Sequence, residues 1–315
     1  MKRVLVTGGA GFIGSHLARA LLDRGDEVSI VDNFDPFYPE RLKRNSLSKG
    51  ARLFENDIRD GPAMQRIFAE VRPDAVVHLA ALAGVRPSLE RPADYMDVNA
   101  RGTVVLLDAA QKTGTRRFVL GSSSSVYGAH AQAPFKETAR IDAPESPYAA
   151  SKVAAEVVAR TFHNLYKIEV AALRFFTVYG PRQRPDLAIH KFSRRMLAGQ
   201  PLPFFGDGSS RRDYTWVDDI VAGVLAACDV PLSYDTFNLG GAHTTSLAEM
   251  VHMLEEVLGV PAILDRQPAQ PGDVPLTSAD VSHAGAVLGY APRTPIREGL
   301  RKFAAWIRGE GRDWI

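Results

Sequence analysis

A tyrosine and a lysine four residues apart are the side chains of this sequence best suited to acid–base chemistry. They lie in the segment 146–152, SPYAASK, where a spacing of four residues places Tyr148 and Lys152 on one face of a helix. The pKa of a free tyrosine is about 10, so only about 0.1% of it is ionised at pH 7. A neighbouring ammonium group favours the phenolate and makes the tyrosine a usable base. The spacing alone is common by chance, so its meaning depends on the residues that precede it.

A glycine-rich turn near the start of the chain has the features of a dinucleotide-binding site. An apolar run at 4–7 leads into the segment 8–14, GGAGFIG. Helical periodicity follows over 15–24, and a second apolar run at 28–31 ends at Asp32. Glycines let the backbone approach a pyrophosphate at the positive end of a helix. Asp32 can accept hydrogen bonds from both ribose hydroxyls and would repel a 2′-phosphate, which favours NAD over NADP. A tight turn in an α/β protein without a cofactor is the alternative.

Strands and helices alternate through the first half of the chain. Apolar runs predict strands at 51–54, 75–81 and 117–120, and helical periodicity predicts helices near 61–71, 95–113 and 148–166. Such alternation predicts a doubly wound parallel sheet of the Rossmann type, with the site at the carboxyl ends of its strands. The segments Asp57-Ile58, Leu79-Ala80-Ala81 and the four serines at 122–125 all follow predicted strands, so we expect them at one edge of the sheet.

Composition narrows the class of protein. The chain has 315 residues, 45% of them hydrophobic and 23% charged, as in an ordinary globular protein, and a net charge of +2 gives no field for binding nucleic acid or a membrane. The single Cys228 excludes an internal disulfide and fits a reducing compartment. We expect no signal peptide and no membrane span, and therefore a cytoplasmic location. The eight histidines have no metal-ligand spacing, so we expect no metal, and His78 in its apolar strand is expected to be a core residue.

The ordered set of motifs resembles the extended short-chain dehydrogenase/reductase family over essentially the whole chain. The resemblance implies that Tyr148 is the catalytic acid and base, that Lys152 binds the nicotinamide ribose, and that a serine orients the substrate hydroxyl. That serine is Ser123. Ser124 is a close rival, because a run of four serines can be aligned with the family motif in more than one way. The residues implied to bind NAD are Gly8, Gly11, Phe12, Ile13, Gly14, Asp32, Asn33, Asp57, Ile58, Leu79, Ala80, Ala81, Asn99, Tyr148 and Lys152.

The second half of the chain resembles the substrate-binding part of nucleotide-sugar epimerases. We predict an NAD-binding domain of residues 1–172 plus 213–241, and a smaller α/β nucleotide-sugar-binding domain of residues 173–212 plus 242–315. The segment 201–208, PLPFFGDG, is similar to the uracil-contacting stretch of these enzymes and contains Phe205. The segment 211–219, RRDYTWVDD, is similar to their Arg-Asp-aromatic motif, whose arginine, here Arg212, reaches the diphosphate. A guanidinium suits that role because it forms two hydrogen bonds to phosphate oxygens.

Several positions resemble UDP-glucuronate 4-epimerases more than UDP-glucose 4-epimerases. They are the loop 84–92 with Arg86, Thr177, Arg184 and the segment 270–273, QPGD, with Asp273. Pro87 in that loop departs from the tyrosine that is usual in the uronate enzymes. The resemblance implies that Thr177 and Arg184 hold the sugar carboxylate. The alternatives are that Arg184 only pairs with Asp186 or caps a loop, and that Thr177 is a half-buried hydroxyl bonded to backbone.

The reaction implied by the resemblance is NAD-dependent C4 epimerisation of a UDP-sugar through a 4-keto intermediate, from UDP-glucuronate to UDP-galacturonate. A UDP-glucose/UDP-galactose 4-epimerase is the nearest rival, followed by a UDP-glucuronate decarboxylase. A 4,6-dehydratase fits less well, because Ser124 and Ser125 stand where those enzymes carry an Asp-Glu pair. A non-catalytic NAD-sensing regulator on the same fold is the alternative from another class, and the intact pair of Tyr148 and Lys152 argues against it.

Members of the family usually form homodimers through two helices, which here would span 93–113 and 148–166. These segments are apolar on more than one face, through Val104, Leu106, Leu107, Val153 and Val157. We therefore expect a homodimer that binds a UDP-sugar, although helices buried in the core of a monomer would have the same pattern.

Overall fold

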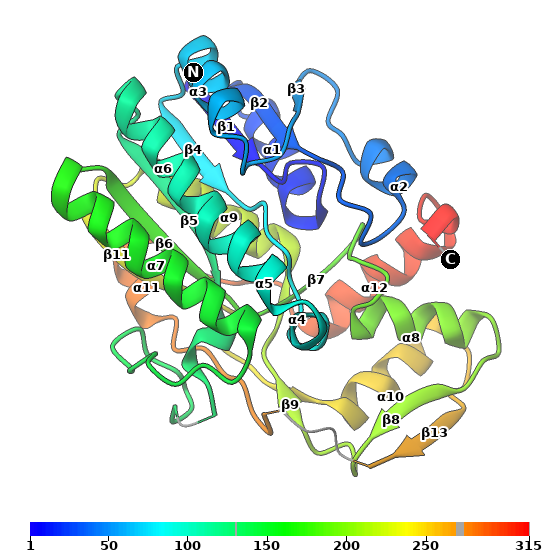
Figure 1. The fold of residues 1–315 in the computed structure, drawn as a ribbon. Coiled ribbons are helices and arrows are strands. Elements are labelled where there is room, and N and C mark those ends of the chain that lie inside the picture. Colours follow the sequence, from blue (N-terminus) through cyan, green and yellow to red (C-terminus); the bar gives the residue numbers. More distant parts are fainter. Residues whose placement is uncertain (130, 269–273, 315) are drawn as a thin grey trace.

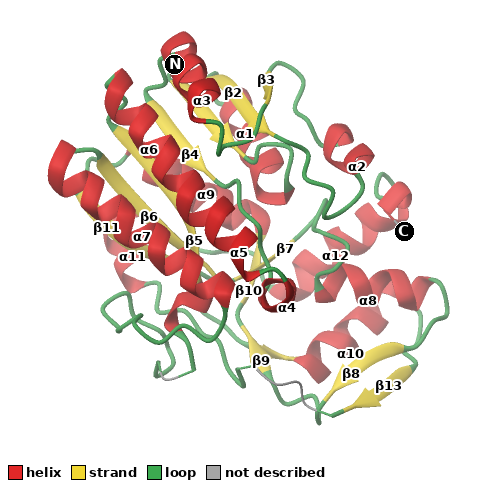
Figure 2. Cartoon of the chain, viewed as in Figure 1, coloured by secondary structure: helices red, strands yellow, loops and turns green. Residues whose placement is uncertain are grey.

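The centre of the protein is a seven-stranded parallel sheet with the order β11-β6-β5-β4-β1-β2-β3 (Figures 1 and 2). The computed structural model describes residues 1–129, 131–268 and 274–314. The strands are β1 (Arg3–Thr7), β2 (Glu27–Asp32), β3 (Arg52–Glu55), β4 (Ala75–His78), β5 (Arg117–Ser123), β6 (Glu169–Phe175) and β11 (Tyr234–Leu239). The expected Rossmann-type doubly wound sheet is therefore present.

Helices cover both faces of this sheet. One face carries α1 (Phe12–Asp23), α9 (Val217–Asp229) and α11 (Ser282–Leu288), and the other carries α3 (Gly61–Val71), α6 (Gly102–Thr113) and α7 (Pro147–Tyr166). Alternate residues of each strand supply the two cores: Val4 and Val6 of β1 pack with the first set of helices, and Leu5 packs with the second. Burial on both faces explains why these strands are apolar along their whole length rather than alternating.

The strand order reverses at β1, and this places the carboxyl ends of several strands around one opening. β1 pairs with β2 on one side and with β4 on the other, so that Thr7 lies opposite both Val31 and His78. The connections after β1 and after β4 leave in opposite directions along the sheet. Ligands of open α/β sheets bind at such a switch point.

A smaller lobe lies beside this edge of the sheet, at the lower right of Figure 1. It contains α8 (Ala188–Leu197), β8 (Leu202–Phe205), α10 (Leu247–Leu258) and β13 (Leu264–Gln267), with β8 and β13 paired in parallel. The remaining elements are α2 (Glu40–Asn45), α4 (Val85–Glu90), α5 (Pro92–Tyr95), β7 (Thr177–Tyr179), β9 (Arg211–Arg212), β10 (Tyr214–Trp216), β12 (Thr245–Ser246), α12 (Ile296–Arg308) and three short turns of π or 3₁₀ helix, η1 (Met96–Arg101), η2 (Ser124–Tyr127) and η3 (Arg312–Trp314). The division into two domains stays a prediction.

Three predicted elements differ from those observed. The strand expected at 75–81 ends at His78, and the strand expected at 117–120 continues to Ser123, because β6 pairs with it as far as Phe175. The helix expected over 95–113 begins with the π-helical turn η1 before α6 starts at Gly102. In the described ranges, no helix combines the length and the apolar character that a membrane crossing requires.

His78, at the end of β4, is a satisfied core histidine as expected. It is 3% exposed, its Nδ1 lies 2.8 Å from the Thr7 hydroxyl and its Nε2 lies 3.1 Å from the Thr103 hydroxyl. The Thr103 hydroxyl donates to the carbonyl of Asn99, so it accepts a hydrogen bond from Nε2 of His78. The ring is therefore assigned as the neutral Nε2–H tautomer.

We expect this histidine to destabilise the protein in acid. Burial, reinforced by the charge of Lys152, lowers the pKa of His78 to about 3. In the unfolded chain the pKa is about 6.5, so as the pH falls below that value only the unfolded state takes up the proton. The free energy of unfolding should therefore fall by up to about 1.4 kcal/mol per pH unit between roughly pH 6.5 and 3. Urea unfolding from pH 7.5 to 4.5 measures this slope.

The matched variants are His78→Gln, which cannot titrate, and His252→Gln, whose wild-type side chain is 69% exposed. The first should flatten the acid slope and the second should leave it nearly unchanged. Equal slopes in the wild type and in His78→Gln would contradict the prediction. His190, whose pKa burial lowers to about 4, contributes in the same direction.

Candidate active site

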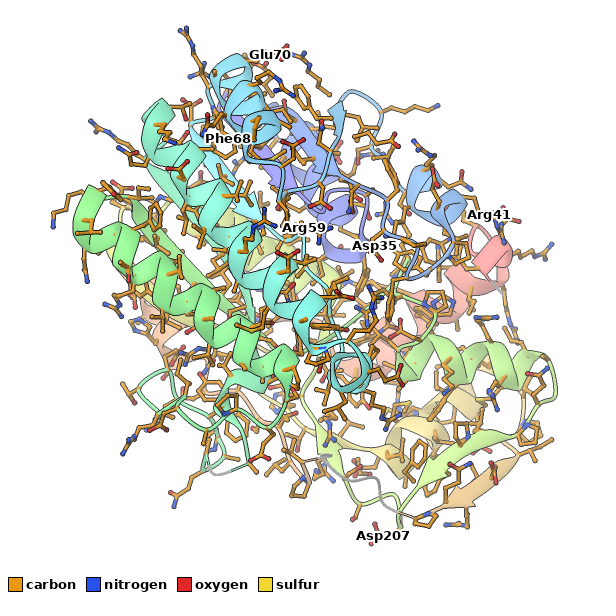
Figure 3. All side chains as sticks on the ribbon, in the orientation of Figure 1. Asp35, Arg41, Arg59, Phe68, Glu70 and Asp207 are labelled. Carbon is orange, nitrogen blue, oxygen red and sulfur yellow. The ribbon has the colours of Figure 1, made fainter. Side chains whose placement is uncertain are left out.

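A cleft of about 520 Å³ opens at the carboxyl edge of the sheet and gathers most of the predicted site residues. Its lining includes Gly8, Gly11, Phe12, Ile13, Gly14, Asp32, Asn33, Asp57, Ile58, Leu79, Ala80, Ala81, Ser123, Ser124, Tyr148, Lys152, Thr177 and Arg184. Figure 3 labels two further residues of its wall, Asp35 and Arg59, in the segments that follow β2 and β3. The cleft therefore brings together residues of both halves of the sequence.

The glycine-rich turn forms one wall because two of its glycines admit no side chain. A Cβ on Gly8, which has a φ of 72°, would lie 2.7 Å from the backbone nitrogen of Ala80. A Cβ on Gly14 would lie 2.1 Å from the carbonyl oxygen of Gly8. These contacts let β1, β4 and the first turn of α1 meet closely. The helix begins after Gly11 without a side-chain cap, so the first-turn N–H groups lie at the cleft with no side chain bound to them.

Asp32 ends β2 and presents a buried carboxylate to the same wall. One oxygen accepts from the backbone N–H of Ala10 at 3.0 Å and the other accepts from that of Phe34 at 2.9 Å. Burial raises the pKa of Asp32, and the two backbone hydrogen bonds and the charge of Lys43 oppose that rise. Each carboxylate oxygen has a second lone pair, so Asp32 retains the capacity to accept hydrogen bonds from a ribose.

Tyr148 stands in the first turn of α7, on the opposite wall. The helix begins at Pro147, and the hydroxyl of Ser146 accepts a hydrogen bond from the backbone N–H of Ala149 at 3.1 Å, which fixes this turn. Burial raises the pKa of the Tyr148 phenol, while a hydrogen bond with Ser123 and the positive charge of Arg184 act in the opposite direction. The contact with Ser123 places that serine beside the phenol, and the choice between Ser123 and Ser124 stays a prediction.

Lys152 lies one turn further along α7, and its side chain is directed toward the backbone of β5. Its Nζ is buried and donates to the carbonyl of Gly121 at 2.8 Å. Burial lowers the pKa of Lys152 to about 8, and the charge of Glu156 opposes that shift. Arg184 is a positive charge that lowers the pKa of Tyr148. The acidification of the phenol by Lys152 stays a prediction.

A buried ion pair holds β5, β6 and α7 together behind Lys152. Glu156 and Arg174, whose side chains are each 4% exposed, form two hydrogen bonds of 3.0 and 2.8 Å. The hydroxyl of Ser122 donates to the same carboxylate at 2.5 Å. Ser122 lies between Gly121, which binds Lys152, and Ser123, which binds Tyr148. The network thus fixes the backbone beside Tyr148 and Lys152.

Thr177 and Arg184 reach the cleft from the segment that follows β6. Thr177 begins β7, and its backbone N–H donates to the carbonyl of Asp213 at 3.0 Å. Arg184 donates from Nε and Nη2 to the carboxylate of Asp186 at 3.0 and 2.8 Å, and from Nη1 to the carbonyl of Ala83 at 3.3 Å. The ion pair considered from the sequence is therefore present, and Arg184 nevertheless lines the cleft.

Four predicted site residues that the structure describes, Asn99, Arg86, Phe205 and Arg212, are not among those that line this cleft. Asn99 is buried, and its side chain bonds the backbone of Leu82 and the hydroxyl of Ser151. The guanidinium of Arg86 lies 5.2 Å from the ring centre of Phe205, at the end of β8. Arg212, in β9, donates to the carbonyl of Arg211 at 2.9 Å. Asp273 lies outside the described residues, so its predicted role has no structural counterpart. Roles for all of these stay predictions.

A comparison with protein families matches residues 4–240 to the NAD dependent epimerase/dehydratase family. The chain belongs to this family. A UDP-glucuronate 4-epimerase of Thermodesulfobacterium geofontis is 40% identical over 314 residues, which cover 98% of this chain and 97% of that protein. The expected family and fold class are confirmed, and with them an NAD-dependent enzyme of the isomerase class.

Solved structures of epimerases superpose closely on the chain. The crystal structure of UDP-glucuronic acid 4-epimerase from Bacillus cereus, in complex with UDP-glucuronic acid and NAD, has a TM-score of 0.90 at 35% identity and covers 97% of this chain and 98% of that one. The structure of UDP-glucose 4-epimerase from Thermotoga maritima with UDP-glucose has a TM-score of 0.92 at 35% identity and covers 98% and 99%. Overall fold therefore does not distinguish the two substrates.

The residues of the epimerase cleft fit NAD. The glycine turn and the uncapped start of α1 suit a pyrophosphate, and the carboxylate of Asp32 suits the hydroxyls of a ribose. A 2′-phosphate would be repelled by the negative charge of Asp32. In the described part of the chain, no group of three or more His, Cys, Asp or Glu residues is arranged to hold a metal ion.

Sequence analysis missed one wall of the epimerase cleft, the loop between β2 and α2. Phe37, Tyr38 and Lys43 all line it. Lys43 is 7% exposed, donates from Nζ to the carbonyl of Asp35 at 2.6 Å and lies over the ring of Tyr38. Tyr38 also packs against Trp314 near the end of the chain. Two adjacent aromatic residues in a polar segment were the available signal, because an exposed loop rarely carries such a pair.

Proposed function

We propose that this protein interconverts UDP-glucuronate and UDP-galacturonate by NAD-dependent epimerisation at C4. The observation that carries the proposal is that Thr177 and Arg184 line the same cleft as Tyr148 and Ser123. A hydroxyl and a guanidinium beside an acid–base tyrosine suit a sugar that carries a carboxylate next to the reacting carbon. The 40% identity to a UDP-glucuronate 4-epimerase supports the same substrate.

Tyr148 and Ser123 would carry the proton chemistry. With NAD bound, the cofactor supplies the acceptor and donor of hydride at C4. Ser123 orients the C4 hydroxyl, and Tyr148 takes its proton as the carbon becomes a ketone. After the sugar has turned its other face, Tyr148 returns the proton to the ketone oxygen, and the alcohol re-forms with the opposite configuration. The cycle has no net change in oxidation state.

The nucleotide must stay bound while the sugar turns, and the smaller lobe would anchor it. In this proposal Phe205 contacts the uracil and Arg212 contacts the diphosphate. Arg86, from the loop 84–92, and Asp273, from the segment 270–273, also contribute to substrate binding. The division into an NAD-binding domain and a nucleotide-sugar-binding domain is part of the same proposal. Its support is that β8 and β13 form a separate sheet beside the cleft.

A uronate substrate requires control of a side reaction. The 4-keto intermediate is a β-keto acid, which loses carbon dioxide when the C5–C6 bond lines up with the π system of the ketone. The electron pair of that bond would then form an enolate, which takes a proton at C5. A hydroxyl and a guanidinium that grip the carboxylate hold the C5–C6 bond out of this alignment. This is the role we assign to Thr177 and Arg184.

The test is to incubate the purified protein, first without added NAD and then with it, with UDP-glucuronate and separately with UDP-glucose, and to separate the products by chromatography. UDP-galacturonate as the product supports the proposal. Formation of UDP-galactose alone would establish the alternative that the similarity to the Thermotoga maritima structure favours. A UDP-pentose as the main product would indicate a decarboxylase.

A homodimer is also part of the proposal. Val104 of α6 and Val157 and Leu165 of α7 are 38%, 58% and 65% exposed, and both helices lie on one face of the molecule (Figure 1). Pairing these faces with a second copy would remove the apolar side chains from water. Sedimentation at micromolar concentration should give twice the mass of the chain, and a monomer would contradict this. The buried, unpaired Cys228 fits the reducing environment of the cytoplasm, which is the location we propose.

A further inference from the structure

We infer that Asp186 is a positioning residue that fixes the guanidinium of Arg184 so that its free edge faces the sugar carboxylate, and that Asp186 thereby sets the preference for uronates. The inference rests on the proposed function. It resolves the two readings of Arg184 that the sequence left open, because the ion pair with Asp186 becomes the reason that Arg184 can bind substrate.

The donors of the guanidinium can be counted. An arginine carries five N–H groups, one on Nε and two on each Nη. Asp186 accepts one from Nε and one from Nη2, and the carbonyl of Ala83 accepts one from Nη1. One N–H on Nη1 and one on Nη2 remain without a partner among the described residues. These two belong to adjacent nitrogens, and the N–H groups of two adjacent nitrogens of a guanidinium can bind both oxygens of a carboxylate.

The surroundings of the guanidinium direct that edge toward the cleft. Arg184 lines the cleft, whereas Asp186 is not among the residues that line it and instead lines two neighbouring hollows. The ring of Phe37 covers one face of the guanidinium, with its centre 4.9 Å from Cζ. The guanidinium is thus held along one edge by Asp186, at one N–H by Ala83 and across one face by Phe37. Tyr148 lines the same cleft, and the charge of Arg184 lowers its pKa.

Removal of Asp186 would have two opposite effects on carboxylate binding. Arg184 would no longer share its charge with a second carboxylate, which favours substrate. Its long side chain would also lose the partner that fixes its rotamer, which disfavours substrate. The side chain of Asp186 is 43% exposed, so solvent screens the first effect. The loss of orientation should therefore prevail.

The test compares Asp186→Asn with the wild type by calorimetric binding of UDP-glucuronate and UDP-glucose to the NAD-loaded enzyme. The ratio of the two Kd values should shift by about tenfold against UDP-glucuronate, because the fork to the carboxylate is disordered. The matched control is Asp142→Asn. Asp142 pairs with Arg140 at the same spacing of two residues, and neither residue lines the cleft. This control should leave the ratio unchanged.

Steady-state kinetics on the same variants separate the possible failures. In Asp186→Asn the KM for UDP-glucuronate should rise more than kcat falls, because the reacting C4 is bound by other residues. Equal losses on both sugars, or a lowered melting temperature that accounts for the change, would overturn the inference and leave the proposed function standing. A tighter Kd for UDP-glucuronate would overturn it as well. A wild-type enzyme that converts UDP-glucose but not UDP-glucuronate would overturn both.

Discussion

Replacing Tyr148 with phenylalanine is expected to lower kcat for C4 epimerisation by about 10³-fold, the effect of removing a positioned acid–base group. The phenyl ring keeps the edge-to-face contact with Tyr95, whose ring centre lies 6.1 Å away, so the first turn of α7 should keep its structure. Only the hydroxyl is lost, the group to which the proposed function assigns the proton transfer with the sugar. The measurement is the initial rate of UDP-galacturonate formation at saturating UDP-glucuronate, together with Kd for the substrate.

Tyr166→Phe is the control for this variant. Tyr166 ends the same helix and is half exposed, so removal of its hydroxyl should leave kcat within the error of the assay. The Kd of UDP-glucuronate should change little in Tyr148→Phe, because the acid–base group acts mainly in the transition state. Retention of kcat to within tenfold would mean that another group, or water, moves the proton.

Replacing Arg184 with alanine should weaken UDP-glucuronate binding by about 10²-fold, since a charge-assisted fork to the carboxylate is lost. A second effect concerns the product. Once the carboxylate is free to rotate, the C5–C6 bond of the 4-keto intermediate can align with the ketone, and part of the substrate should leave as carbon dioxide and a UDP-pentose. Calorimetry gives the first quantity, and chromatography with trapped carbon dioxide gives the second.

The ratio between substrates isolates the role in carboxylate binding. Arg184 also lowers the pKa of Tyr148, and this contribution is lost for every sugar. UDP-glucose carries no carboxylate on its sugar, so its affinity should fall much less than the affinity for UDP-glucuronate. Arg140→Ala removes an exposed arginine that does not line the cleft and should change neither quantity. Unchanged affinity for UDP-glucuronate with no pentose would exclude Arg184 from carboxylate binding.

The parts of the site that could be predicted are those fixed by local geometry. The glycine turn, Asp32 and the serine run each lie within a few residues of a strand that apolar periodicity reveals, and the order of these strands carries them to one edge. Tyr148 and Lys152 were found for the same reason, since helical spacing is a local property. The fold class followed from the alternation of strands and helices, which needs no knowledge of long-range contacts.

The remaining parts depend on contacts between segments far apart in the sequence. The packing of Phe37 on Arg184 joins residues 147 positions apart through two irregular segments, and no periodicity describes such segments. The direction of Lys152 toward Gly121 has the same origin, because helical spacing gives the face of a residue but not the acceptor that its long side chain meets. The amide of Asn99 joins Leu82 to Ser151, a contact that no local pattern of the sequence indicates. The contacts made by irregular loops and by long polar side chains could therefore not be predicted from the sequence.

The buried network of Ser122, Glu156 and Arg174 restricts how this sequence can change over time. Loss of one charge from a buried pair leaves the other uncompensated and costs about 3–5 kcal/mol. That is a large share of the roughly 5–15 kcal/mol by which a typical domain is stable. A lineage that alters Arg174 or Glu156 singly would therefore pass through a protein close to unfolding, and only a joint replacement of both by well-packed apolar residues would avoid it. We therefore expect these positions to be substituted together, although they lie on three separate elements.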